Sequence, residues 1–162
     1  MAELLIINGP PGVGKTTVAR HLAGGKPGTV CVHGDDLRAF APADARAHLG
    51  GGSTYRAAAA LVRAYLGMGA TRVLFDYVFL RRSHVEHFFG ALGDTDAPVT
   101  MFTLWAPLAV VEAREAERPL RSPLGEAVRE CWEEIDRNRA HLGRFIAADT
   151  ASVGDIARQL DP

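Results

Sequence analysis

An eight-residue segment near the start of the chain carries glycines, a lysine and a threonine at a spacing that suits phosphate binding. Residues 9–16, GPPGVGKT, match the pattern G-x-x-x-x-G-K-[ST] at every specified position. They lie between an apolar run and a helical pattern, where backbone N–H groups point at an anion and glycines leave space for it. The pattern predicts a nucleoside triphosphate site in which Lys15 binds the β- and γ-phosphates and Thr16 binds Mg²⁺. The predicted contacts are Gly9, Pro10, Pro11, Gly12, Val13, Gly14, Lys15, Thr16 and Thr17.

Carboxylates follow two other apolar runs. The segment HGDDLR, 33–38, places Asp35 and Asp36 directly after TVCV, and Asp76 ends the run RVLFD. If these runs are strands of one parallel sheet, their carboxyl ends meet at the edge that also carries the phosphate-binding loop. The location therefore predicts a chemical role for at least one of the carboxylates.

The elements that must position these groups alternate regularly between strand and helix. Strands are predicted at 3–8, 29–32, 72–75, 99–105 and 145–148, and helices at 15–23, 54–66, 81–92, from Pro107 and at 153–160. A short helix is expected to start within 33–38, and an amphipathic helix carries a buried stripe from Val128 to Leu142. Residues 41–53, with a proline and three consecutive glycines, predict a loop or broken helix. The alternation predicts a parallel sheet covered on both faces.

Composition narrows the class of protein. The 162 residues suffice for one domain, and 48% hydrophobic with 23% charged residues is typical of a soluble globular protein. A net charge of -1 provides no overall field for nucleic acid or an acidic membrane. The two cysteines, Cys31 and Cys131, are expected to be buried reduced thiols, and we find no metal spacing among the histidines and cysteines. Because no apolar run is long enough for a signal or membrane segment, a cytoplasmic protein is expected.

A phosphate-binding loop alone is compatible with ATPases, GTPases, switches and kinases. Guanine-reading N-K-x-D and D-x-x-G motifs are missing at suitable positions, and motor ATPases need a longer chain. The short chain and the arginines after the fourth predicted strand favour a small kinase.

Three motifs together resemble the nucleoside-monophosphate-kinase-like family of small P-loop phosphotransferases. They are the loop at 9–16, GD-x-x-R after the second strand, and R-x-x-x-R-x-x-R at Arg114, Arg118 and Arg121. Within this group, residues 107–118 and 149–157 are most similar to chloramphenicol phosphotransferase, whereas HGDDLR is closer to adenylylsulfate and polynucleotide kinases. The resemblance covers most of the chain for the fold and only scattered motifs for the substrate.

The resemblance implies a P-loop NTPase fold of class α/β. It would have three α/β/α layers, a five-stranded parallel sheet of order 2-3-1-4-5 and a short arginine-bearing lid at about 114–125. Residues 1–162 would form a single kinase domain. The nucleotide would lie at the carboxyl ends of the strands.

On this resemblance Asp35 is the candidate base for the acceptor hydroxyl, and it suits the N-cap of the following helix equally well. Asp36 is either a first-turn residue stabilised by the helix dipole or a partner of Mg²⁺ through water. Asp76 is expected either to bind Mg²⁺ through a water molecule or to lie near the acceptor; the alternative is that it only begins a turn. Arg38 binds an anionic part of the acceptor or is a solvated surface residue. Tyr77, with Phe79, lines an acceptor pocket or belongs to the core.

The arginines after the fourth strand complete the expected site. The resemblance assigns Arg114 to stacking on adenine and Arg118 to the phosphates, as a catalytic charge beside Lys15. Arg121 is a candidate for the lid and for acceptor binding. The alternative is that Arg114 and Arg118 are solvated and paired with Glu115 and Glu117.

These residues predict an ATP- and Mg²⁺-dependent kinase acting on a hydroxyl of a small molecule, such as an antibiotic or metabolite. A second hypothesis is a 5′-hydroxyl nucleic-acid or nucleotide kinase, since balanced charge argues against a long polyanion but not against a nucleotide end. A third, from another class, is an ATP-binding regulatory or toxin-like protein without a small-molecule acceptor. The sequence indicates neither the acceptor nor the oligomeric state.

Overall fold

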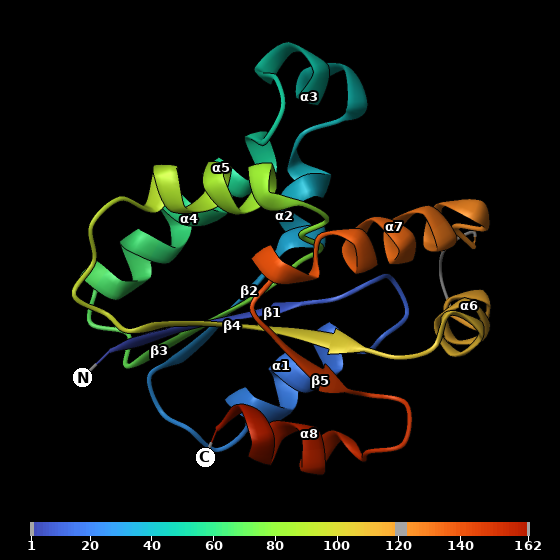
Figure 1. Ribbon diagram of the computed structural model, residues 1–162. Helices are drawn as coiled ribbons and strands as arrows, with labels where there is room; N and C mark the ends of the chain where they lie inside the picture. The colour runs from blue at the N-terminus through green and yellow to red at the C-terminus, as the bar shows by residue number, and fades with distance from the viewer. Residues whose placement is uncertain (1, 119–122, 162) are drawn as a thin grey trace.

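A parallel sheet lies between two layers of helices in the computed structural model, which describes residues 2–118 and 123–161 (Figure 1). The strands are β1 (Glu3–Asn8), β2 (Thr29–His33), β3 (Arg72–Asp76), β4 (Val99–Trp105) and β5 (Arg144–Ala147). Every pairing is parallel, and the order is β2-β3-β1-β4-β5. The predicted three-layer architecture and strand order are confirmed.

The helices also follow the predicted alternation. They are α1 (Lys15–Ala23), α2 (Gly34–Phe40), α3 (Ala43–Leu49), α4 (Ser53–Gly67), α5 (Arg82–Leu92), α6 (Leu108–Ala116), α7 (Glu126–Arg137) and α8 (Val153–Leu160), with a 3₁₀ turn at Arg139–His141. The amphipathic helix predicted to reach Leu142 ends earlier, at Arg137. The side-chain amide of Asn138 donates to the Glu134 carbonyl at 2.9 Å, a local bond that competes with helix continuation. Among the described residues, no helix is long and apolar enough to cross a membrane.

The central strand β1 supplies both faces of the sheet with core residues. Leu5 and Ile7 join the cluster that includes α1 and α8, whereas Leu4 and Ile6 join the cluster that includes α4 and α5. Figure 1 shows α1 and α8 below the sheet and α4 and α5 above it. A strand buried on both sides is expected to read as a continuous apolar run, which ELLIIN does.

A buried polar chain anchors the carboxyl end of β1. The Asn8 side chain donates to Thr103 Oγ1 at 3.0 Å, and that hydroxyl donates to the Leu142 carbonyl at 2.5 Å. Asn8 Oδ1 accepts from the Phe79 N–H at 2.7 Å. Asn8 therefore ties the segment after β3 to the strand that leads into the phosphate-binding loop.

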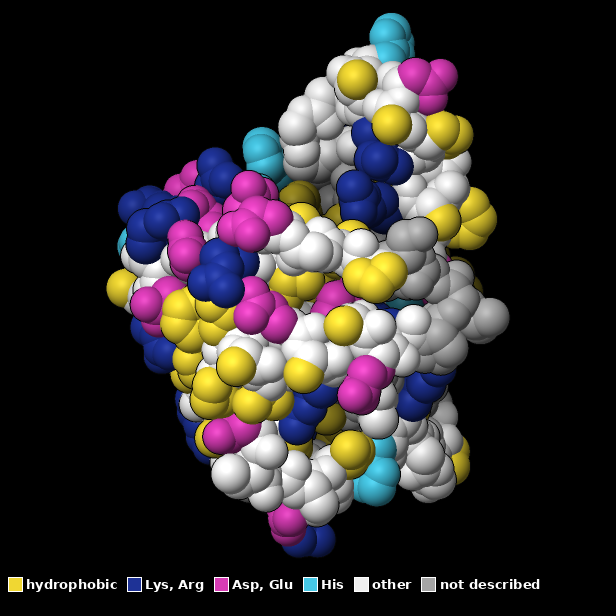
Figure 2. Space-filling model, turned by 90° about the vertical axis from the view of Figure 1, so that its right-hand side faces the viewer, with side chains coloured by type: hydrophobic (Ala, Val, Ile, Leu, Met, Phe, Trp, Pro, Cys, Tyr) yellow, Lys and Arg dark blue, Asp and Glu magenta, His cyan; other side chains and the backbone are white. Residues whose placement is uncertain are grey.

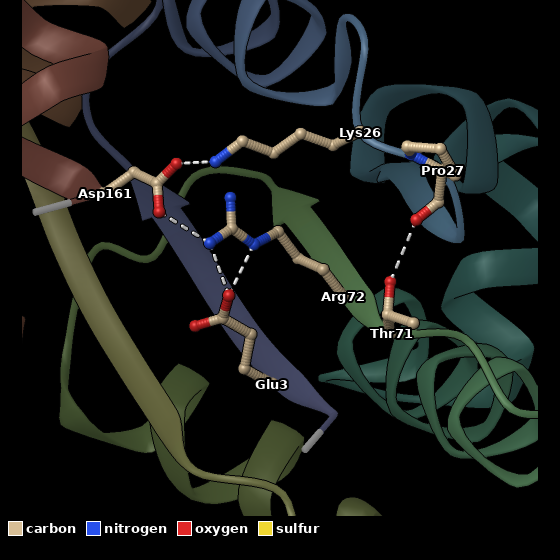
Figure 3. Close-up of polar contacts among 6 residues, drawn as sticks. All are labelled: Glu3, Lys26, Pro27, Thr71, Arg72 and Asp161. Carbon is tan, nitrogen blue, oxygen red and sulfur yellow. Dashed lines mark hydrogen bonds and ion pairs between the residues drawn. The ribbon is translucent and has the colours of Figure 1, made fainter.

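The opposite, amino-terminal edge of the sheet is closed by ion pairs (Figure 3). The Arg72 guanidinium contacts Glu3 through Nε at 2.5 Å and Asp161 through Nη2 at 2.7 Å. Lys26 also pairs with Asp161. These contacts join β1, β3 and the residue after α8 at the edge away from the candidate site.

Residues 41–53 form an arm that stands apart from the sheet layers. Its helix α3 has no buried residue and projects from the rest of the molecule in Figures 1 and 2. Arg46 donates to the carbonyl of Arg38 at 3.3 Å and also to that of Ala41, so it caps the end of α2. The expectation of a broken helix outside the core is confirmed.

Candidate active site

The glycine-rich loop connects β1 to α1 in a conformation that requires glycine. Gly9, Gly12 and Gly14 have φ values of 147°, 84° and 102°, which L side chains rarely adopt. A Cβ on Gly12 would lie 2.6 Å from the Val111 carbonyl oxygen and 3.1 Å from Glu115 Cβ. Gly12 therefore lets α6 pack directly against the loop.

Lys15 begins α1 and bends back over the loop. Its ammonium donates to the carbonyls of Gly9 at 2.9 Å and Pro10 at 3.1 Å. Burial lowers the pKa of Lys15 to about 8, although the carboxylates of Asp35 and Asp76 oppose this shift. Both carboxylates thus act on the ammonium from the carboxyl ends of neighbouring strands.

This lowered pKa gives nucleotide binding a predictable pH dependence. Phosphate favours the charged ammonium, so binding raises the pKa of Lys15 and takes up a proton above pH of about 8. Affinity for a non-hydrolysable ATP analogue is expected to fall about tenfold per pH unit from there to the pKa of the complex. Calorimetric titrations at pH 7 to 9.5, in two buffers of different ionisation enthalpy, measure affinity and proton uptake. Lys15→Arg, which keeps its charge, is expected to give a flat profile; an equally flat wild-type profile would contradict the assignment.

Thr16 connects to the end of β3. Its hydroxyl donates to Asp76 Oδ2 at 2.6 Å, and Asp76 is 4% exposed. The second oxygen of Asp76 contacts Nδ1 of His33. Among the described residues, no group of three or more His, Cys, Asp or Glu side chains could hold a metal ion. A hydroxyl and a carboxylate are nevertheless hard oxygen donors that fit Mg²⁺ held mainly by nucleotide phosphates and water.

The HGDDLR segment forms the end of β2 and the first turns of α2. His33 is the N-cap, and no side-chain cap bond forms there, so the interpretation of Asp35 as N-cap is wrong. Asp35 lies in the first helical turn and lines the main cavity together with Arg38. Both aspartates are exposed, and Asp36 is not among the residues lining that cavity. Of the two aspartates, Asp35 is therefore the one that lines the cavity.

The residues after β3 divide between the cavity and the core. Tyr77 lines the cavity, and its ring packs so closely on Gly34 that a Cβ there would lie 2.3 Å from it. Phe79 is fully buried in the core. Tyr55, which sequence reasoning did not place at the site, donates its hydroxyl to the Val78 carbonyl at 2.7 Å and holds this segment. No local signal pointed to Tyr55, because its partner is 23 residues away.

Arg114, on α6, and Arg118, just after its end, line the same cavity. Arg114 donates to the carbonyls of Ala148 at 2.9 Å and Asp149 at 3.4 Å, so it lies against the segment between β5 and α8. Arg118 donates to Glu115 Oε2 at 3.4 Å, and Glu115 is 2% exposed. The pairing of Arg118 with Glu115 is found, and Arg118 still lines the cavity. Arg121 and part of the predicted lid lie outside the described residues.

A cavity of about 600 Å³ unites these groups. Gly9 and Pro10 are buried and are not among its lining residues. Cys131, expected to be buried, is only partly so and lines the cavity. The lining residues are Pro11, Gly12, Val13, Gly14, Lys15, Thr16, Thr17, Val18, Asp35, Arg38, Tyr77, Val78, Arg114, Arg118, Leu124, Ala127, Cys131, Ala148, Ala151, Val153 and Ile156.

The sheet order and the loop between β1 and α1 define a P-loop kinase-like fold. A family model described as an AAA domain matches residues 4–142, and the chain therefore belongs to that AAA domain family. No curated protein matches the chain at a significant level.

Solved structures share the fold over nearly the whole chain. The tunicamycin resistance protein of Deinococcus radiodurans has a TM-score of 0.74 and 22% identity, covering 99% of this chain and 94% of its own. A gluconokinase from Sinorhizobium meliloti 1021 has a TM-score of 0.68 and 16% identity, with coverages of 98% and 89%. A sugar kinase from Janibacter sp. HTCC2649 has a TM-score of 0.66 and 16% identity, with coverages of 98% and 92%. At these identities the likeness shows the fold alone.

Proposed function

We propose that the protein is an ATP- and Mg²⁺-dependent phosphotransferase that moves the γ-phosphoryl group to a hydroxyl of a small molecule. The observation that carries this proposal is the shared cavity. Lys15 and Thr16 of the phosphate-binding loop line it together with Asp35, Arg38 and Tyr77. A carboxylate beside a phosphate site can accept the proton of an acceptor hydroxyl, and a cation there can help to position the acceptor.

In the proposed reaction the acceptor oxygen forms a bond to the γ-phosphorus while the bond to the ADP oxygen breaks. Asp35 accepts the hydroxyl proton as this happens. Lys15 and Arg118 stabilise the negative charge that spreads over the transferred phosphoryl oxygens. When bound, Mg²⁺ neutralises charge on the β- and γ-phosphates, and Thr16, with Asp76 through water, would hold it.

The base end of the nucleotide is assigned to the segment between β5 and α8. Arg114 is held there by two backbone carbonyls and lines the cavity, and in this proposal its guanidinium stacks on adenine. Ala151, Val153 and Ile156 supply apolar lining nearby. As part of the proposal, the chain is one kinase domain whose lid includes residues 114–125, working with cytoplasmic ATP.

A small-molecule acceptor is supported by the names of the neighbouring structures, which concern tunicamycin resistance, gluconate and sugars. We expect γ-labelled ATP, Mg²⁺ and a library of antibiotics and hydroxylated metabolites to yield a labelled small molecule. The library should include tunicamycin, chloramphenicol and gluconate, with Lys15→Met as the inactive control. If only inorganic phosphate is labelled across the library, the transfer proposal is wrong.

A second candidate acceptor is a 5′-hydroxyl nucleic-acid or nucleotide end, because Arg38 of the DD-x-R sequence lines the cavity and could bind a phosphate. A 5′-hydroxyl oligonucleotide in the same assay separates this candidate from small alcohols. Tight ATP binding with no labelled acceptor in any extract would instead favour an ATP-binding regulator.

A further inference from the structure

Three side chains from three segments form a continuous hydrogen-bonded chain behind the phosphate-binding loop. Thr16 Oγ1 donates to Asp76 Oδ2 at 2.6 Å, and Asp76 Oδ1 contacts Nδ1 of His33. We propose that His33 is a positioning residue, which fixes Asp76 so that Thr16 presents its oxygen lone pairs to nucleotide-bound Mg²⁺. The inference rests on the proposed ATP- and Mg²⁺-dependent function.

The hydrogen bond to Asp76 orients the Thr16 hydroxyl. A hydroxyl has one hydrogen to donate and two lone pairs, and only a lone pair can bind a cation. Because the hydrogen of Thr16 is directed at Asp76, the lone pairs are directed away from that carboxylate. Thr16 also lines the cavity beside Lys15. The hydroxyl is thus oriented before the metal arrives.

Asp76 is itself oriented by contacts at both of its carboxylate oxygens. The last torsion of an aspartate side chain is broad, so one hydrogen bond leaves its carboxylate free to rotate. A second bond at the other oxygen removes this freedom. A carboxylate only accepts hydrogen bonds, so the Nδ1 atom of His33 that faces it must carry a hydrogen.

The backbone places the two residues side by side. His33 and Asp76 are register partners at the last residues of β2 and β3. The His33 side chain is 16% exposed, and Asp76 is 4% exposed. His33 is also the N-cap of α2, which carries Asp35. His33 therefore adjoins Asp76, near the proposed Mg²⁺ position, and also the helix that carries Asp35, the proposed base.

The test compares two substitutions that differ in one donor. His33→Asn places an N–H donor near the position of Nδ1, whereas His33→Leu fills a similar volume without one. Binding of a non-hydrolysable ATP analogue is measured by calorimetry with Mg²⁺ and with EDTA. We expect His33→Leu to lose about 10- to 100-fold of its affinity with Mg²⁺ and to stay within about twofold of wild type in EDTA. His33→Asn is expected to stay within about threefold in both conditions.

The controls separate a positioning role from a structural one. His48→Leu changes an exposed histidine on α3 and should match wild type. If His33→Leu keeps the wild-type response to Mg²⁺, or weakens binding equally in EDTA, the positioning role is wrong. Should His33→Leu fail to fold, His33→Ala is measured in its place, with the same loss expected. A wild-type protein that binds no ATP, or is insensitive to Mg²⁺, refutes the proposed function itself.

Discussion

The Asp35→Asn variant is expected to bind ATP as wild type does and to transfer the phosphoryl group about 10²- to 10⁴-fold more slowly. Asparagine keeps the size of the side chain and cannot accept the acceptor proton. Asp35 lies in the first turn of α2 without a capping bond, so the change should leave the helix intact. Single-turnover transfer to the identified acceptor measures the chemical step, and calorimetry measures ATP affinity.

The neighbouring aspartate provides the matched comparison for this prediction. Asp36 is exposed and does not line the cavity, so Asp36→Asn is expected to retain transfer within about threefold. Transfer by Asp35→Asn within threefold of wild type would show that Asp35 is not the base. A large loss in Asp36→Asn alone would assign that role to Asp36.

Substitution of Gly12 by alanine is expected to destabilise the fold and abolish nucleotide binding together. The residue has φ of 84°, and a Cβ would lie 2.6 Å from the Val111 carbonyl oxygen, so α6 would have to move. Left-handed strain and overpacking together should lower the free energy of unfolding by about 2 to 5 kcal/mol. Because α6 carries Arg114 and leads directly into Arg118, its displacement would disturb two cavity residues. Urea unfolding and ATP-analogue titration measure the two effects.

Gly50→Ala separates strain from the clash. Gly50 has φ of 81°, yet an added Cβ would meet no atom within 4 Å. With ψ of 172° Gly50 lies in a region that almost only glycine adopts, so this variant should lose about 1 to 3 kcal/mol of unfolding free energy and keep wild-type ATP affinity. Equal losses in the two variants would mean that contact with α6 contributes nothing.

The order of strands and helices could be predicted because each element has its own local pattern. The run VTMFTLW gave strand β4 with its observed bounds, and 153–160 did the same for α8. The end of α7 could not be predicted in this way. The helix ends at Arg137, just before Asn138, whose side chain bonds back to Glu134. Leu142 lies beyond the helix but is buried in the core, so in the sequence it extends the apolar stripe past the true helix end.

The site could be predicted where one short motif contains the geometry. Residues 9–16 specify their own loop, because the glycines, the lysine and the threonine are adjacent in the sequence. The sequence assigned His33 no role at the site, since its partner Asp76 is 43 residues away. Only the pairing register of β2 with β3 brings them together, although the implied strand order already made those strands neighbours. Cys131 likewise reaches the cavity from α7 through packing alone.

The alternation of β1 between two cores has a consequence for how such an enzyme can change. Residues of α1, α6 and α8, which adjoin the proposed nucleotide site, pack in one cluster; those of α4 and α5, which support the segment carrying Tyr77, pack in the other. The sheet lies between the two clusters, and α7 contributes to both of them, with Val128 in the first and Ile135 in the second. Under the proposed function, we expect that repacking around α4 and α5 can accommodate a new acceptor while the packing of α1, α6 and α8 beside the proposed nucleotide site stays as it is.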